Sequence, residues 1–215
     1  MRVRTASPPR HSTRDQLLAK GREIVLRSGF QGLTVREVAA AAGANLGSFV
    51  YHFGTRERFL RELIEEWYAP LMSRITDVAG GEGRPLERLR GGILQLVEYG
   101  RAQHGFLGRL LMAAAAGEPA VREFASTLFG RHPLVLVGLI AEAQADGSIV
   151  REQPLQVLMF LLGSAGLPLL LANAWHGPPL FDKSTSAALA RFACDPGPIE
   201  QRLDWAIRGL APRGP

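Results

Sequence analysis

The chain has 215 residues, of which 47% are hydrophobic and 21% charged, a composition typical of soluble globular proteins with one or two domains. Its single cysteine, Cys194, excludes an internal disulfide, and its five histidines are scattered, so we expect a reducing cytoplasm, no metal and no cofactor. Residues 1–60 carry ten Arg or Lys and four Asp or Glu, a net charge of +6, whereas residues 61–215 carry fifteen and sixteen. A basic end favours a phosphate-bearing partner, although a basic arm on an ordinary domain would have the same charge.

The first predicted helix covers residues 13–29. Thr13 and Gln16 have the spacing of a capping box, and Gly29 can end the helix. The residues between them place apolar side chains at helical spacing.

Residues 34–53, TVREVAAAAGANLGSFVYHF, have the layout of a helix-turn-helix. Thr34 can cap a first helix with Glu37 three residues later, and Gly43 can take the positive φ of the turn. Asn45 can cap a second, short helix that runs to about Tyr51. Such a unit places its second helix in the major groove of DNA.

The second helix of this unit carries the candidate base contacts. We expect Asn45, Leu46, Ser48 and Tyr51 to be exposed, with the two phenylalanines of the helix, at 49 and 53, turned inward. Asn and Ser can hydrogen-bond base edges, and Leu46 can contact a thymine methyl.

The remaining elements are also predicted as helices, which makes the fold class all-α. A long helix from Arg56 to about Val78 contains Pro70, which should kink it. The later helices are expected from Pro85, over 106–116, from Pro119 with Pro133 kinking or dividing it, from Pro154 to Trp175, over 185–192, and from Pro198 to Leu210.

The stretch from Leu155 to Trp175 has no charged residue and approaches the length of a membrane span. It also contains polar and helix-breaking residues, among them Gln156, Gly163 and Pro168. A helix buried on two sides, by its own domain and by a second subunit, would have the same composition, and we favour that reading without a membrane.

The segment AAGANLGSFVYHFGTRERFL resembles the end of the DNA-binding domain of the tetracycline-repressor (TetR/AcrR) family. The matching elements are the turn at 42–44, the pair Gly47 and Ser48, the triplet at 51–53 and the triplet at 55–57. Upstream, GREIVLRSGFQGLTVREVA is similar to the family's first helix, its glycine-aromatic corner and its second helix. The resemblance covers about residues 13–65, and one departure is Val50, where many members have a phosphate-contacting tyrosine.

The resemblance implies a DNA-binding domain over residues 11–71 and an effector-binding and dimerisation domain over 72–215. It implies phosphate contacts by Thr34 and Arg36 and, at the start of the next helix, by Thr55 and Arg56. Tyr51 is expected at a phosphate rather than in the core, whereas His52 fits a phosphate donor and a half-buried position equally well. The implied function is a transcriptional regulator, of repressor type, that leaves its operator when a small apolar or amphipathic molecule binds.

The C-terminal part resembles the family in layout only, with helices around a ligand pocket and a homodimer formed by the last two main helices. Ordinary core packing is an open alternative for each pocket candidate. The pocket candidates are Trp67, Leu71, Tyr99, His104, Phe106, Met112, Phe124 and Phe129. The candidates for the dimer interface are Leu158, Leu161, Leu162, Leu169, Leu203, Ile207 and Leu210.

Two other classes of function are weighed against a regulator. An enzyme would need a supported catalytic group, but His176, Asp182 and Ser184 are close only in sequence and lack a nucleophile-elbow motif. A helical adaptor, or a small-molecule-binding protein without a DNA-binding role, could use the same helices to bind its partner. Salt-dependent binding to DNA would separate both alternatives from a regulator.

Overall fold

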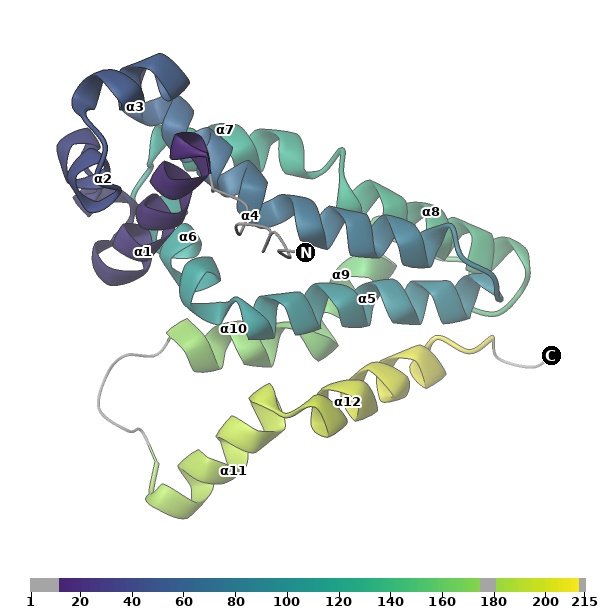
Figure 1. Cartoon of the computed structure of the whole chain (residues 1–215). Helices are drawn as coiled ribbons and strands as arrows, with labels where there is room; N and C mark the ends of the chain where they lie inside the picture. The colour runs from purple at the N-terminus through teal and green to yellow at the C-terminus, as the bar shows by residue number, and fades with distance from the viewer. Residues whose placement is uncertain (1–11, 175–180, 213–215) are drawn as a thin grey trace, which may run out of the picture.

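A computed structural model describes residues 12–174 and 181–212, and the described part of the chain contains α-helices and no strand. Helices α1 to α3 gather at one end, and α4 leads from them into a larger helical body (Figure 1). The first six helices are α1 Thr13–Gly32, α2 Val35–Ala41, α3 Leu46–Phe53, α4 Arg56–Ala79, α5 Pro85–Ala102 and α6 His104–Ala115. The others are α7 Pro119–Leu128, α8 His132–Ala145, α9 Pro154–Ala165, α10 Leu167–Ala174, α11 Lys183–Cys194 and α12 Pro196–Gly209.

The caps of the first helices follow from local chemistry. Ser12, rather than the expected Thr13, caps α1, and Asp15 completes its capping box. Thr34 caps α2 as expected, since its Oγ1 accepts the N–H of Glu37 at 3.2 Å. α1 extends to Gly32, three residues beyond the predicted end, but Gly29 interrupts it with a φ of 77°, which glycine adopts at little steric cost.

The core of the N-terminal unit is aromatic. Phe49 and Phe53 of α3 pack against Phe59 of α4, with ring centroids 5.1 and 4.9 Å from that of Phe59. Gly21 of α1 is required beside them, because a Cβ there would lie 2.3 Å from Cζ of Phe59. Three helices and the first turns of α4 therefore share one core.

α4 belongs to both parts of the molecule. It is helical from Arg56 to Ala79 and includes Pro70, and its buried side chains run from Phe59 to Ile75. The boundary expected between residues 71 and 72 falls inside this helix, so the division into two domains stays a prediction.

The prediction of a single long helix from Pro154 to Trp175 is wrong. α9 ends at Ala165 and α10 begins at Leu167, while Trp175 lies outside the described residues. Pro168 has no N–H to donate to the carbonyl of Ser164 four residues earlier, which breaks the helical ladder. The freed carbonyl accepts a hydrogen bond from Nε of Arg202 at 3.0 Å instead.

Arg202 ties α12 to this break. Its guanidinium also donates to the carbonyls of Ala165, at 3.1 Å, and of Phe192, and it lies 4.3 Å from the ring centroid of Phe192. The group is buried and, since desolvation disfavours the charge, its pKa is lowered. Backbone carbonyls and an aromatic face therefore hold this buried cation in place.

The stretch Pro119–Ala145 is long and apolar enough to span a bilayer, by length and composition only. It is two helices, α7 and α8, that meet at a turn containing Gly130, as expected from the proline at 133. α7 packs against α4, and α8 packs against α5 with Leu136, Leu139 and Ile140 buried. These apolar side chains of α8 belong to the core of this fold.

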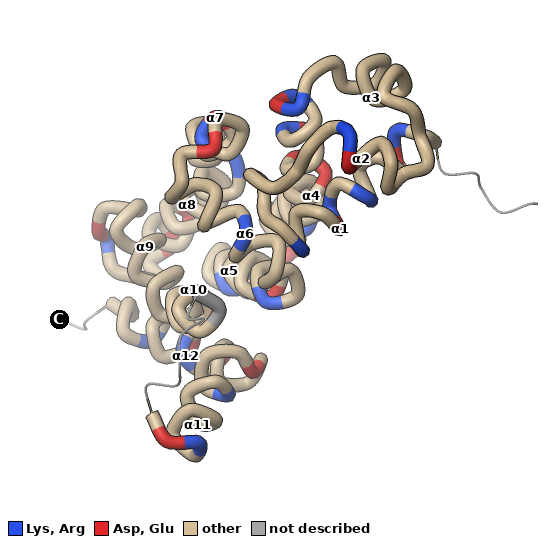
Figure 2. The backbone as a smooth tube through the Cα atoms, turned by 90° about the vertical axis from the view of Figure 1, so that its left-hand side faces the viewer, with Lys and Arg blue, Asp and Glu red and all other residues tan. Residues whose placement is uncertain are grey.

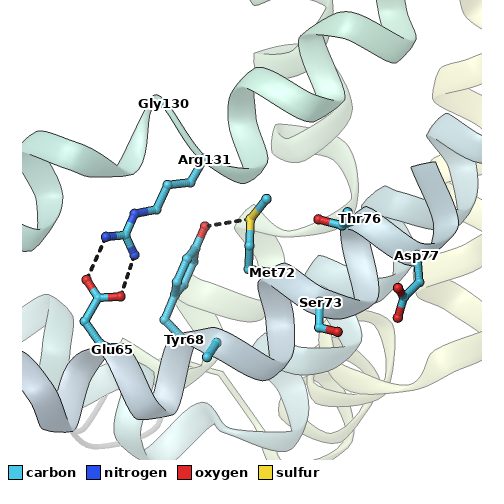
Figure 3. Close-up of a pocket in the computed structure, with 9 residues that line it drawn as sticks. Glu65, Tyr68, Met72, Ser73, Thr76, Asp77, Gly130 and Arg131 are labelled. Atoms are coloured by element: carbon cyan, nitrogen blue, oxygen red, sulfur yellow. Dashed lines mark hydrogen bonds and ion pairs between the residues drawn. The ribbon is translucent and has the colours of Figure 1, made fainter. Parts of the chain in front are cut away.

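A groove of about 510 Å³ follows α4 beside the turn between α7 and α8 (Figure 3). The Arg131 guanidinium forms two hydrogen bonds of 2.7 Å with the carboxylate of Glu65 and covers the ring of Tyr68. Behind it, the Tyr68 hydroxyl lies 2.8 Å from Nδ1 of His132 and accepts the backbone N–H of His132 at 3.3 Å. Burial lowers the pKa of His132 to about 4, so the imidazole is neutral at pH 7.

The buried imidazole predicts that the protein loses stability in mild acid. Between pH 6.5 and about 4 the unfolded chain binds a proton at His132 and the folded chain does not, so the free energy of unfolding falls as the pH falls. This group alone contributes a loss of up to about 3 kcal/mol over that range. Urea unfolding of wild type and His132→Gln at several pH values measures it, with exposed His104→Gln as the matched control. An unchanged pH dependence in His132→Gln would contradict the assignment.

Candidate nucleic-acid interface and apolar cavity

The outer face of α3 is a stripe of residues 46, 47, 50 and 51, all of them exposed. Tyr51 is 84% exposed, so its side chain is not part of the core. The rings of Phe49 and Phe53 are fully buried on the opposite face, as expected. His52 is half-buried, with its ring 5.1 Å from that of Tyr51.

Ser48, which was expected to be exposed, is half-buried and bonds to Asn45 at the start of α3. Oδ1 of Asn45 accepts the N–H of Ser48 at 2.8 Å and the Ser48 hydroxyl at 3.1 Å. The predicted cap is therefore present, and it occupies the Asn45 acceptor. The side-chain amide N–H groups of Asn45 are therefore the donors that these two residues can offer to a partner.

The N-terminus of α2 presents Arg36. This side chain is exposed and has no hydrogen-bond or ion-pair partner among the described residues. Its neighbour Glu37 pairs with Arg27 at 2.5 Å. Figure 2 shows basic residues at several points around α1, α2 and the start of α4. In the chain, Thr34 caps the N-terminus of α2 and Arg36 lies in its first turn.

The phosphate contact expected for Arg56 does not fit the structure. Its guanidinium faces inward, where Nε donates to the carbonyl of Leu33 at 2.9 Å and Nη2 to that of Phe30 at 2.5 Å. It also lies 3.2 and 3.4 Å from the two carboxylate oxygens of Glu118, a residue 62 positions away. Thr55, next to it, is exposed and caps α4 by accepting the N–H of Arg58 at 3.1 Å.

The Arg56–Glu118 pair connects the N-terminal helical unit to the helical body behind it. Glu118 directly precedes α7, and its side chain is only 6% exposed, against 25% for Arg56. A buried carboxylate with a guanidinium partner is costly to leave unpaired. Arg56 therefore acts as a bracket that holds the corner between α1 and α2 to the start of α7.

A cavity of about 520 Å³ lies among α4, α5, α6, α9 and α10, and it is partly open to the surface, where its lining residues Leu111, Met159 and Leu167 are exposed. Three of the pocket candidates, Trp67, Leu71 and Tyr99, line it, and the Tyr99 hydroxyl donates to the backbone carbonyl of Trp67. Among residues 12–174 and 181–212, no charged side chain lines it. The lining residues that the sequence analysis missed are Leu96, Val97, Gly100, Leu107, Leu111, Met159, Leu162, Gly163, Gly166, Leu167, Leu169 and Leu170.

The other five predicted pocket residues do not line this cavity. Phe106 is buried beside it and stacks on Trp67 with ring centroids 5.1 Å apart. Phe124 packs in the core against Tyr68, with ring centroids 5.2 Å apart. The side chains of His104, Met112 and Phe129 are exposed on the surface. A residue type that suits a pocket does not reveal on which side of its helix the pocket lies.

The residues expected at a dimer interface lie on the inner sides of their helices. Leu158, Leu161, Leu169 and Leu203 are buried in the core of the same chain, and Leu162, Ile207 and Leu210 are partly buried against that core. The apolar side chains of α9 to α12 that are exposed are not the ones expected at the interface. They are Leu155, Met159, Phe160, Leu167, Leu171, Leu189, Phe192 and Trp205.

The polar residues weighed for an enzyme form a helix cap. Asp182 caps α11 by accepting the N–H groups of Ser184 at 2.9 Å and Thr185 at 3.1 Å. Hydrogen bonds from the Ser184 and Thr185 side chains hold the pKa of Asp182 well below its usual range. His176 lies outside the described residues.

Comparisons with known proteins agree with this arrangement. Residues 17–63 match the family model described as bacterial regulatory proteins of the tetR family. The chain is 27% identical over 157 residues to the HTH-type transcriptional repressor DhaR of Mycobacterium sp. (strain GP1), a match that spans 72% of this chain and 79% of that protein. It is 30% identical over 140 residues to the HTH-type transcriptional repressor KstR2 of Mycolicibacterium smegmatis, spanning 64% of this chain and 67% of that protein.

The fold is also shared with solved structures. The ketosteroid transcriptional regulator KstR2 of Mycobacterium tuberculosis superposes with a TM-score of 0.63 at 19% identity, covering 94% of this chain and 97% of that one. The arrangement of the helices is thus shared with a solved structure over nearly the whole chain. The chain belongs to the TetR family of bacterial transcriptional regulators and is a DNA-binding protein of that family.

Proposed function

We propose that the protein is a cytoplasmic repressor that binds its operator as a homodimer and leaves it when an apolar small molecule occupies the cavity. The observation that carries this proposal is that two helices of the cavity wall, α4 and α6, also hold the DNA-binding unit. Trp67 and Leu71 of α4 line the cavity, and the same helix begins at the Arg56 bracket. The residues that would contact DNA phosphates are Thr34, Arg36, Tyr51, His52 and Thr55, and the exposed stripe of α3 would face the bases.

α6 offers a direct route from the cavity to the DNA-binding unit. Leu107 and Leu111 of this helix line the cavity. From the same helix, Phe106 packs edge-to-face on Phe30, with ring centroids 5.6 Å apart. Arg109 donates to the carbonyls of two residues near the end of α1, at 3.2 and 3.3 Å. A ligand that shifts α6 would therefore move α1 with it.

The required change in geometry is small. Two half-sites of an operator lie about 34 Å apart, or at multiples of that spacing, so a shift of a few ångströms between two DNA-binding units breaks the match. A ligand needs to bind the released state more tightly by about 1–3 kcal/mol, which lowers operator affinity about 5- to 150-fold.

The cavity also limits the chemistry of the effector. Its volume of about 520 Å³ lies within the range that holds a drug-sized molecule. Since the described residues of the lining are aliphatic, aromatic or glycine, a charged portion of a ligand would find no counterion among them. We therefore expect an uncharged, mostly apolar body in the cavity.

A single substitution should occupy part of the cavity without disturbing the fold. Gly163 lines it, and a Cβ at this position would meet nothing within 4 Å. Gly163→Leu should weaken ligand binding about tenfold, because overpacking a site costs about 1–3 kcal/mol. The matched control is Gly138→Leu on α8, where a Cβ also has open space but the residue does not line the cavity.

The experiment starts from duplexes selected by the full-length protein from a randomised DNA library. A library of apolar metabolites is screened by thermal shift, and each compound that stabilises the protein is assayed for release of a selected duplex. Wild type and Gly138→Leu should respond alike, whereas Gly163→Leu should need about ten times more compound. The proposal fails if every stabilising compound leaves the affinity for DNA unchanged.

A further inference from the structure

The face of α3 that is free to enter a major groove is apolar. Leu46 and Val50 lie one helical turn apart on it and are about half exposed, with Gly47 and Tyr51 beside them. α3 has no Arg, Lys, Gln, Glu or Asp along its length. The pairs of donors and acceptors that usually distinguish guanine and adenine are therefore absent from this face.

The amide and hydroxyl at the start of α3 do not replace them. An Asn that recognises adenine in the bidentate manner donates to N7 and accepts the N6 amino group through its side-chain oxygen. In this chain that oxygen already accepts two hydrogen bonds from Ser48, one from the N–H and one from the hydroxyl. Bidentate recognition by Asn45 would require loss of the cap of α3.

Gly47 allows a close approach of this apolar face to the bases. It is exposed in the first turn of α3, between the two aliphatic side chains along the helix. A Cβ at this position would lie 3.2 Å from Oδ1 of Asn45, so a larger residue would also press on the cap. With no side chain here, Leu46 and Val50 are the projecting groups of the stripe together with Tyr51.

We propose that Leu46 and Val50 determine operator specificity by packing against the C5 methyl groups of thymines in the major groove. Thymine is the base that presents an apolar group there, and apolar contact with that methyl is an established form of base recognition. This inference rests on the DNA-binding part of the proposed function and adds the chemical feature that is recognised. The operator half-site should therefore contain thymines at the positions that face these two side chains.

The test removes methyl groups from the DNA and from the protein. Duplexes are first selected by the full-length protein from a randomised library, and the affinity is then measured with each thymine replaced in turn by uracil, which lacks only the methyl. Burial of one methyl is worth about a fourfold change in affinity, so one or two uracil positions per half-site should each weaken binding by about that factor. Uracil at flanking thymines is the control.

Matched protein variants assign the contact. Leu46→Ala and Val50→Ala each remove an exposed side chain, so neither should alter folding, which circular dichroism checks. Each variant should bind the thymine and uracil duplexes equally at its own position and keep the methyl preference at the other. The inference is overturned if no uracil changes the affinity by more than about 1.5-fold, or if both variants keep the full methyl preference. Failure to select any duplex would instead overturn the proposed function.

Discussion

Replacing Arg56 with methionine should lower the free energy of unfolding by about 2–3 kcal/mol and leave the salt dependence of DNA binding unchanged. The substitution removes the partner of the buried Glu118 carboxylate and two donors to the carbonyls of Phe30 and Leu33. Loss of one member of a fully buried pair costs about 3–5 kcal/mol, and the 25% exposure of Arg56 moderates that cost. Because the Arg56 guanidinium faces inward, its charge does not displace a counterion from DNA, so its loss should not change the salt dependence of binding.

The comparison for Arg56→Met is a substitution of Arg36, an arginine of the same DNA-binding unit. It is exposed and without a partner in the described part of the chain, so Arg36→Ala should change stability by less than about 0.5 kcal/mol. If it contacts a phosphate, the slope of log affinity against log salt should fall by about 0.9. Urea unfolding and mobility shifts at several salt concentrations measure both quantities. If Arg56→Met is as stable as wild type and has a reduced salt slope, Arg56 contacts a phosphate and does not hold α1 to α7.

Phe160→Glu and Trp205→Glu should each convert a dimer to monomers and weaken operator binding about 100- to 10,000-fold. Both side chains are about half exposed, on α9 and α12 respectively. An exposed apolar surface of this kind is typical of a subunit interface, and a charge buried there has no partner. The loss in affinity follows because the two half-sites are no longer bound by one linked molecule.

The control for the dimer experiment is Met112→Glu on α6, a position that is 69% exposed. Analytical ultracentrifugation should show this variant as a dimer with unchanged operator affinity. Leu161→Glu should instead fail to fold, because Leu161 is fully buried within its own chain. A wild-type protein that sediments as a folded monomer at micromolar concentration would refute the proposed interface.

The local chemistry of the DNA-binding unit could be predicted from the sequence. Thr34 and Asn45 cap their helices and Gly43 takes the positive φ of the turn, because each of these features depends on residues within a few positions. The inward positions of Phe49 and Phe53 followed from helical spacing for the same reason. A resemblance over about residues 13–65 then indicated the family, which the comparisons confirm.

The tertiary structure decided which groups far apart in the chain meet. The sequence predicted Arg56 at the surface, because its partner Glu118 lies 62 positions later in the chain and meets it only in the folded structure. In α9, apolar residues surround the helix, so periodicity could not show that Leu158 and Leu161 face the core while Phe160 faces outward. The cavity likewise depends on the distances between five helices, and on glycines such as Gly163 whose missing side chains leave the space. Spacing along one helix determines the faces of that helix, but only packing determines what each face meets.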